Sequence, residues 1–190
     1  MTEEIIIAGF GGQGVLSMGK ILAYSGIMQD QEVSWMPSYG PEMRGGTANV
    51  AVILSDDRIS SPILNEFDTA IILNQQSMDK FESMVKPGGL LLYDPNGITR
   101  RPEREDITIA TVEGVKEASK LENKKTFNMI ILGAFLKVHP IVKMANVHKG
   151  LEKSLPQRHH HLIPLNEKAI TIGMDKVQII QESNKIRAII

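Results

Sequence analysis

The chain has 190 residues, no cysteine and a formal net charge of −1 at pH 7, with 42% hydrophobic and 23% charged residues. This balance is typical of a globular protein, and the length suits one domain with a substantial core. The near-zero charge and the scattered basic residues do not indicate nucleic-acid binding. The absence of cysteine excludes disulfides, thiolate-ligated zinc, cysteine-ligated iron–sulfur clusters and a cysteine nucleophile.

The N-terminal residues, MTEEIII, are acidic where a secretory signal peptide would be basic, and their apolar run is short. No stretch approaches the roughly 18 consecutive apolar residues that a membrane-spanning helix needs. We therefore expect a cytoplasmic protein without membrane insertion.

Predicted strands alternate with predicted helices in the first part of the chain. Residues 5–8 form a continuous β-branched apolar run, which predicts a strand buried on both faces in a parallel sheet. Apolar residues recur near helical spacing from 13 to 29. Further strands are expected at 32–35, 47–55, 68–74, 90–94 and 106–112, a short extended piece at 59–64, a loop at 36–46, a helix at 75–85 and a turn at 86–89.

The character of the chain changes after residue 112. Helices are expected at 113–120, 126–138, 141–155 and 166–181, with Pro140 and Pro156 as stops. Strands alternating with helices, followed by a helical tail, predict a three-layer α/β fold. We expect a single domain, with an α/β part at about 1–112 and a helical part at about 113–190.

The first strand runs into a glycine-rich segment in which Gly9, Gly11 and Gly14 fit the spacing G-x-G-x-x-G. Glycines at a strand-to-helix junction permit positive φ and close ligand approach, and the helix start favours anions. A nicotinamide site would also need an acidic residue at the end of the second strand, whereas Glu32 lies at its beginning. No Gly-Lys-Ser/Thr completes a Walker motif. A phosphate site, a packing turn and a nicotinamide site all stay open here.

A second glycine-containing segment, SYGPEMRGGTANV, spans residues 38–50. Pro41 stiffens it, and Gly45 and Gly46 allow a partner to approach the backbone. Glu42 and Arg44 are two positions apart, so they would face the same way in an extended loop. The segment is either a solvated surface loop with one ion pair or an interaction loop.

The run RHHH at residues 158–161 raises the question of a metal site. Adjacent histidines point in different directions on any regular element, and no acidic residue is close in sequence. We therefore expect a polar loop after Pro156 and assign no metal ligand in this chain. The sequence also contains no G-x-S-x-G elbow and no paired-carboxylate motif that would indicate hydrolysis.

Three segments in order, GFGGQGV at 9–15, SYGPEMRGG at 38–46 and FNMIILGA at 127–134, resemble the gamma subunit of 2-oxoacid:ferredoxin oxidoreductases. The resemblance runs over nearly the full length. The 38–46 form is most similar to the 2-oxoglutarate and branched-chain branches. The resemblance implies a multisubunit enzyme that decarboxylates a 2-oxoacid on thiamine diphosphate, reduces ferredoxin through iron–sulfur clusters and transfers the acyl group to coenzyme A.

The resemblance implies the fold and a site as well. The fold would carry a Rossmann-like glycine loop after the first strand. Residues expected to line the coenzyme A or phosphate path are Gly9, Gly11, Gly12, Gln13, Gly14, Lys125 and Asn128. Some relatives have arginine where this chain has Thr126, so Lys124 or Lys125 would take its place. The interface or substrate-side loop comprises Ser38, Tyr39, Gly40, Pro41, Glu42, Arg44, Gly45 and Gly46. No catalytic residue is expected in this chain alone.

The remaining implications concern partners. Alpha, beta and delta (ferredoxin-like) subunits would carry thiamine diphosphate, Mg²⁺ and the iron–sulfur clusters, and ferredoxin would accept electrons. A 2-oxoglutarate enzyme is favoured, with branched-chain (2-oxoisovalerate), pyruvate and indolepyruvate members as alternatives. A stand-alone nucleotide- or coenzyme A-binding regulator and an independent nicotinamide oxidoreductase are the alternatives from other classes.

Overall fold

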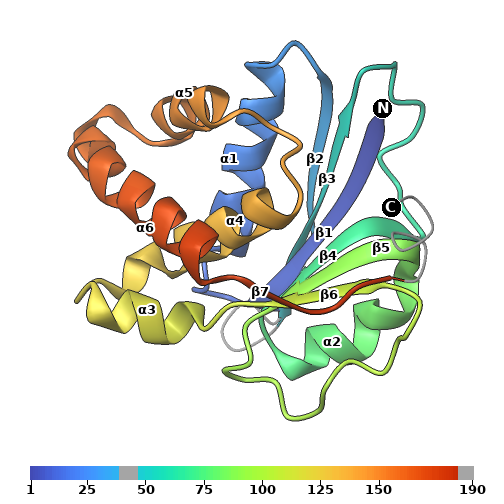
Figure 1. Cartoon of the computed structure of the whole chain (residues 1–190). Coiled ribbons are helices and arrows are strands. Elements are labelled where there is room, and N and C mark those ends of the chain that lie inside the picture. Colours follow the sequence, from blue (N-terminus) through green and yellow to red (C-terminus); the bar gives the residue numbers. More distant parts are fainter. Residues whose placement is uncertain (39–46, 184–190) are drawn as a thin grey trace.

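The computed structural model describes residues 1–38 and 47–183. In these residues seven strands form one sheet in the order β2-β3-β1-β4-β5-β6-β7 (Figure 1). Their bounds are β1 Thr2–Phe10, β2 Glu32–Ser38, β3 Thr47–Ser55, β4 Phe67–Ile72, β5 Val85–Tyr93, β6 Thr108–Thr111 and β7 Gln178–Gln181. Strands β1, β4, β5 and β6 are parallel, whereas β3 is antiparallel to both β1 and β2 and β7 is antiparallel to β6.

Strand β1 lies in the middle of the sheet, and its apolar run at residues 5–8 is buried on both faces as expected. Its neighbours differ from the expectation. It pairs in parallel with β4 on one side only and antiparallel with β3 on the other. The sheet is therefore mixed rather than parallel, because β2 and β3 return beside β1 as an antiparallel pair.

Helices cover both faces of the sheet, which confirms the three-layer α/β fold (Figure 1). One face carries α1 (Val15–Ile27), α3 (Gly114–Lys120), α4 (Phe127–Val138), α5 (Met144–Ser154) and α6 (Ile163–Lys176). The other face carries α2 (Gln75–Phe81). Alternate residues of β1 divide between the layers: Ile5 and Ile7 join the core under α1 and α4, and Ile6 and Ala8 join the core under α2.

Several expected boundaries are wrong. The last helix ends at Lys176, and residues 178–181 form strand β7 on the sheet edge rather than helix. The run RHHH lies in a 3₁₀ helix, η3 (Gln157–Leu162), rather than in a loop. Strand β2 continues to Ser38, residues 86–89 belong to β5 rather than to a separate turn, and residues 59–64 form no strand.

Helices α4 and α6 cross at two glycines. A Cβ atom on Gly133 would lie 1.9 Å from the carbonyl oxygen of Ile170, and one on Gly173 would lie 1.9 Å from the carbonyl oxygen of Ile130. Only glycine allows the two backbones to approach this closely. The crossing fixes α6 on α4 and so positions the start of both helices.

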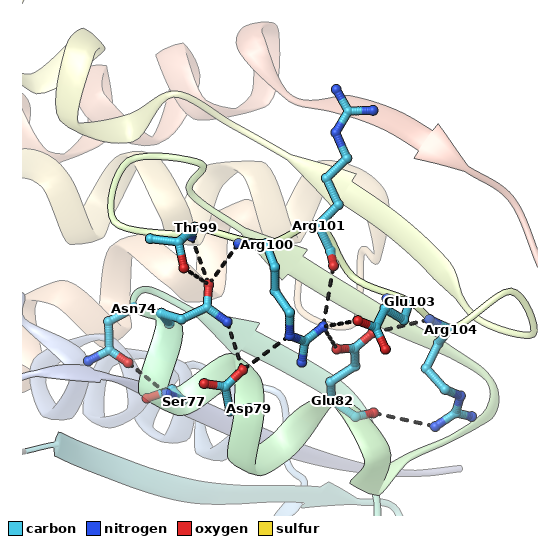
Figure 2. Close-up of polar contacts among 10 residues, drawn as sticks. Asn74, Ser77, Asp79, Glu82, Thr99, Arg100, Arg101, Glu103 and Arg104 are labelled. Atoms are coloured by element: carbon cyan, nitrogen blue, oxygen red, sulfur yellow. Dashed lines mark hydrogen bonds and ion pairs between the residues drawn. The ribbon is translucent and has the colours of Figure 1, made fainter.

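The long connection between β5 and β6 is fixed to α2 by a polar network (Figure 2). The buried carboxylate of Glu82 accepts hydrogen bonds from Arg100 Nη1 at 2.7 Å and from the backbone N–H groups of Glu103 and Arg104. Gln75 Oε1 accepts from the backbone N–H groups of Thr99 and Arg100. These contacts hold the connection in place, although residues 94–107 form no helix or strand.

Candidate functional site

The glycine-rich turn joins the end of β1 to the start of α1, at the edge of the sheet where the parallel strands end. Gly12 and Gly14 have φ angles of 95° and 76°, in the region that favours glycine. Gly14 is the N-cap of α1, which has no side-chain cap and no acidic residue in its first turn. No carboxylate in the first turn of α1 therefore neutralises the partial positive charge at the start of this helix.

The side chain of Gln13 is bonded within the protein. Its Oε1 accepts a hydrogen bond from the backbone N–H of Phe10 at 2.6 Å, and its Nε2 donates to the carbonyl oxygen of Leu73 at 3.2 Å. A Cβ atom on Gly9 would lie 2.5 Å from Gln13 Oε1. Gly9 and Gln13 therefore form the inner, packed side of the turn and connect it to the end of β4.

The structure brings Asn128 of α4 against Gly14, 114 positions earlier in the chain. Asn128 Nδ2 donates to the carbonyl oxygen of Gly14 at 3.3 Å, and a Cβ atom on Gly14 would lie 2.5 Å from that nitrogen. Gly11 and Gly12 are exposed, and a Cβ atom on Gly12 would have no neighbour within 4 Å. The outer side of the turn is thus open to a ligand.

A hollow of about 310 Å³ adjoins this turn on the side of the helices. It lies among the first turn of α1, the 3₁₀ helix η2 (Lys124–Thr126), the start of α4, η3 and the start of α6. We call it the α1–α6 hollow; it is lined by Ser17, Ile21, Asn123, Lys125, Thr126, Asn128, Met129, Leu155, His159, Leu162, Leu165 and Asn166. Two predicted site residues, Lys125 and Asn128, therefore meet in one hollow, whereas Lys124 does not line it.

The second predicted segment is only partly described. Ser38 is the last residue of β2 and pairs with Asn49 of β3. Tyr39, Gly40, Pro41, Glu42, Arg44, Gly45 and Gly46 lie outside the described residues. Their expected role at an interface stays a prediction.

Asp94 and His139 are titratable groups with a raised pKa outside this region. Burial raises the pKa of Asp94, whose two carboxylate oxygens accept from the backbone N–H groups of Asn96 and Val115. At the opposite edge of the sheet, a hydrogen bond with Glu3 raises the pKa of His139, and the Nε2–Oε2 distance is 3.0 Å. Asp94 is bonded to backbone N–H groups and His139 to Glu3, so both groups serve the fold. Within residues 1–38 and 47–183 no group of three or more potential ligands could hold a metal.

Sequence reasoning missed Ser17, His159 and Asn166 as lining residues of the α1–α6 hollow. They belong to three separate elements that only the helix packing brings together. The run RHHH marked the correct segment, but no sequence signal distinguishes the half-buried His159 from the exposed His161. Among the described residues, no helix combines the length and the apolar composition that crossing a membrane requires.

Comparison with known proteins identifies the family. Residues 4–176 match the pyruvate ferredoxin/flavodoxin oxidoreductase family. The chain belongs to this family. The match covers most of the chain and confirms the resemblance that the three motifs indicate.

Curated relatives include two kinds of subunit. The 2-oxoglutarate synthase subunit KorC of Methanocaldococcus jannaschii is 32% identical over 160 residues, covering 83% of this chain and 86% of KorC. The ketoisovalerate oxidoreductase subunit VorA of Methanothermobacter thermautotrophicus is 39% identical over 133 residues, covering 70% of this chain. The chain spans only 28% of the length of VorA.

Solved structures share the fold. The gamma subunit of a keto/oxoacid ferredoxin oxidoreductase from Geobacter sulfurreducens matches with a TM-score of 0.80 and 27% identity, covering 93% of this chain and 96% of that one. The 2-oxoglutarate:ferredoxin oxidoreductase of Magnetococcus marinus, with 2-oxoglutarate, coenzyme A and succinyl-CoA bound, matches with a TM-score of 0.82. It is 22% identical, with 92% of this chain and 30% of that chain covered, and shows the fold alone.

Proposed function

We propose that the chain is the gamma subunit of a multisubunit 2-oxoacid:ferredoxin oxidoreductase. The observation that carries the proposal is the similarity, over most of their length, to gamma-type subunits that are separate polypeptides of about this size. The chain covers 86% of KorC at 32% identity and 96% of the Geobacter gamma subunit with a TM-score of 0.80. The complex would convert a 2-oxoacid and coenzyme A into an acyl-CoA and CO₂, and two ferredoxin molecules would each accept one electron.

For the substrate we propose 2-oxoglutarate, because the KorC subunits of three methanogens match over 86–88% of their own length. A branched-chain 2-oxoacid is the second candidate. It is favoured by the higher identity of 39% to VorA, although that match covers a smaller part of both chains.

The contribution of this chain is to bind and position coenzyme A. Support comes from the open outer side of the turn at Gly11 and Gly12, the uncapped start of α1, and the meeting of Asn128 and Lys125 beside it. Backbone N–H groups at a helix start and one lysine suit the phosphates of coenzyme A. Holding the coenzyme in place would accelerate acyl transfer by proximity. The iron–sulfur clusters are assigned to partner subunits, since this sequence has no cysteine ligand. Thiamine diphosphate and Mg²⁺ are assigned to the alpha, beta and delta subunits on the family resemblance.

Co-expression with the neighbouring reading frames, followed by purification through a tag on this chain, tests the proposal. We expect thiamine- and cluster-carrying subunits to co-purify and to reduce ferredoxin with 2-oxoglutarate and coenzyme A. Parallel assays with 2-oxoisovalerate, pyruvate and indolepyruvate determine the branch, and the purified chain alone should show no oxoacid oxidation. Purification of the chain without partners but with bound nucleotide would favour the stand-alone regulator. NADH binding in a fluorescence titration would favour a nicotinamide enzyme.

A further inference from the structure

We infer that a second pocket, at the edge of the sheet where the parallel strands begin, binds a free amino acid with an aliphatic side chain. This edge is opposite to the glycine-rich turn, and the proposed function assigns no role to it. The pocket has a volume of about 380 Å³, and we call it the β4–β5 pocket. It is lined by Glu3 of β1, Asp68 and Thr69 of β4, residues 86–90 of β5, Thr108 of β6 and Val138 and His139 at the end of α4.

An irregularity in strand pairing opens this pocket. One residue of β4, Asp68, lies opposite four residues of β5, 86–89. Gly88 has a φ angle of 83°, and a Cβ atom on Gly89 would lie 2.6 Å from the carbonyl oxygen of Asp68. The two glycines therefore allow a bulge that other residues would not adopt without strain. Because β5 bulges here, side chains of four neighbouring elements line a space at the edge of the sheet.

The charged groups that line the pocket are balanced in sign. Glu3 and Asp68 supply two carboxylates, and Lys86 and His139 supply two basic groups. Lys86 Nζ donates to Asp68 Oδ1 at 2.8 Å, and His139 Nε2 lies 3.0 Å from Glu3 Oε2. The hydrogen bond with Glu3 raises the pKa of His139, which favours the charged ring. A ligand of one charge would meet like charges as well as opposite ones, whereas a zwitterion can place each end against the opposite sign.

These groups keep hydrogen-bonding capacity for a ligand. In the described part of the chain, two of the three N–H groups of Lys86 Nζ are bonded, one to Glu4 and one to Asp68. An ionised carboxylate can accept at about four positions, and the carboxylate of Glu3 uses two of them there. We assign the ammonium group of the ligand to Glu3 and Asp68. Its carboxylate is assigned to Lys86 and His139.

The rest of the pocket suits a small aliphatic side chain. Glu3, Thr69 and Thr108 are 7%, 1% and 6% exposed, so the polar groups at the base of the pocket are held within the fold. Leu90 and Val138 add apolar surface. A few fixed polar groups among apolar ones are typical of small-molecule sites, and about 380 Å³ lies at the lower end of the range for such sites. The size therefore favours a ligand as small as one amino acid.

The chain supplies a matched control for the carboxylate contact. Lys86 Nζ forms ion pairs with both Glu4 and Asp68, and both carboxylates are partly exposed. Only Asp68 lines the pocket. Asp68→Asn and Glu4→Gln therefore each remove one ion pair of the same lysine, but only the first removes a ligand contact. A difference between them reports on the pocket and not on the ion pairs.

The test is isothermal titration of the full chain, and of the co-expressed complex, with L-leucine, L-valine, 3-methylbutylamine and 4-methylpentanoate. We expect L-leucine to bind at least about tenfold more tightly than the amine, which lacks its carboxylate, or the acid, which lacks its ammonium group. Asp68→Asn should weaken leucine binding by about tenfold, and Glu4→Gln by less than about twofold. Val138→Phe, which fills the pocket without changing a charge, should also weaken it by about tenfold.

Thermal unfolding verifies that the three variants fold. It also gives a second measure of binding, since a ligand that binds only the folded state stabilises it. L-leucine at ten times its Kd should raise the Tm of the parent chain by about 3–5 °C. The Tm of Val138→Phe should stay unchanged at the same concentration.

The outcomes separate this inference from the proposed function. Absence of binding of both amino acids at about 10 mM, equal affinity for leucine and either fragment, or equal effects of Asp68→Asn and Glu4→Gln would overturn the inference. Binding to the chain that is lost in the complex would also overturn it, because a partner subunit would then cover the pocket. If the complex oxidises a 2-oxoacid but leucine does not bind, the inference fails and the proposed function stands. If leucine binds as expected but no oxoacid-oxidising complex can be assembled, the site stands and the proposed function fails.

Discussion

Gln13 illustrates how one residue can fit a motif and yet serve the fold. The GFGGQGV segment places it in the expected coenzyme path, but both ends of its amide group are bonded to backbone, one to Phe10 and the other to Leu73. One N–H of Nε2 and one lone pair of Oε1 are thus committed to the turn. We therefore assign it to the support of the turn.

Replacing this residue tests the assignment. Gln13→Leu removes both hydrogen bonds and leaves two backbone groups without their partner, so we expect the free energy of unfolding to fall by about 1–3 kcal/mol. Urea denaturation of the variant measures the change, with Gln157→Leu on the exposed surface of η3 as a control that should change it little. Unchanged stability together with lost coenzyme A binding would restore the role that the resemblance implies.

The glycine spacing also shows what can be predicted at this scale. Positive φ at Gly14 and a turn between strand and helix follow from the sequence, because glycine is the residue that tolerates this conformation without strain. That Asn128 packs against Gly14 does not follow from local sequence. The family resemblance placed Asn128 near the coenzyme, and the structure adds that its side chain is also bonded to the turn.

The crossing of α4 and α6 determines where two of the three helix starts around the α1–α6 hollow lie. A Cβ atom added to Gly133 or to Gly173 would lie 1.9 Å from a backbone carbonyl oxygen of the other helix. Backbone, unlike a flexible side chain, cannot move aside without shifting the whole helix.

We expect Gly133→Ala or Gly173→Ala to destabilise the protein by about 1–3 kcal/mol or more through overpacking, despite the higher helix propensity of alanine. Chemical denaturation measures this. Lys137→Ala, at an exposed position of α4, should have little effect. If both glycine variants were as stable as the parent, the helices would not be in backbone contact.

The sequence predicts helices and strands well where a local apolar pattern defines them, and poorly where a strand forms only by pairing with another strand. The apolar runs of β1, β3 and β4 are strands as expected. The sequence predicts the last helix at 166–181, which includes residues 178–181. They form β7 instead, because β6 offers an unpaired edge and backbone pairing along that edge outweighs the local preference.

One ion pair joins distant parts of the whole molecule. His139 is the C-cap of α4, and Glu3, in the first part of β1, is buried and also accepts a hydrogen bond from Thr69 of β4 at 2.8 Å. The hydrogen bond with Glu3 is the main cause that raises the pKa of His139 above its ordinary value of 6.5. The pair thus fastens the helical layer to the start of the sheet.

Its contribution depends on pH with a definite sign. Because the folded state raises the pKa of His139, the stabilisation is complete below about pH 6.5 and is lost as the pH rises through the folded-state value. We expect His139→Gln to lower the free energy of unfolding at pH 6 by about 0.5–1 kcal/mol, since the ring is partly exposed and screened. The difference from the parent should shrink by pH 8.5.

Urea denaturation at several pH values measures this effect. His161→Gln, whose ring has no carboxylate partner among the described residues, should show no such trend. A His139→Gln deficit that is constant from pH 6 to 8.5 would mean that packing, not the charge of His139, supplies the stabilisation.

The sequence by itself determined the fold class, the strand–turn–helix at the glycine segment and the family, because these depend on local periodicity, on glycine conformation and on motifs read in order. Only the tertiary structure decided the mixed sheet, the packing of Asn128 on the turn and the α1–α6 hollow. Those features depend on contacts between residues that are distant in the sequence, such as Phe10 with Thr47 in the sheet and Gly14 with Asn128 at the turn. No local preference encodes such contacts, since they form only when the helices pack on the sheet.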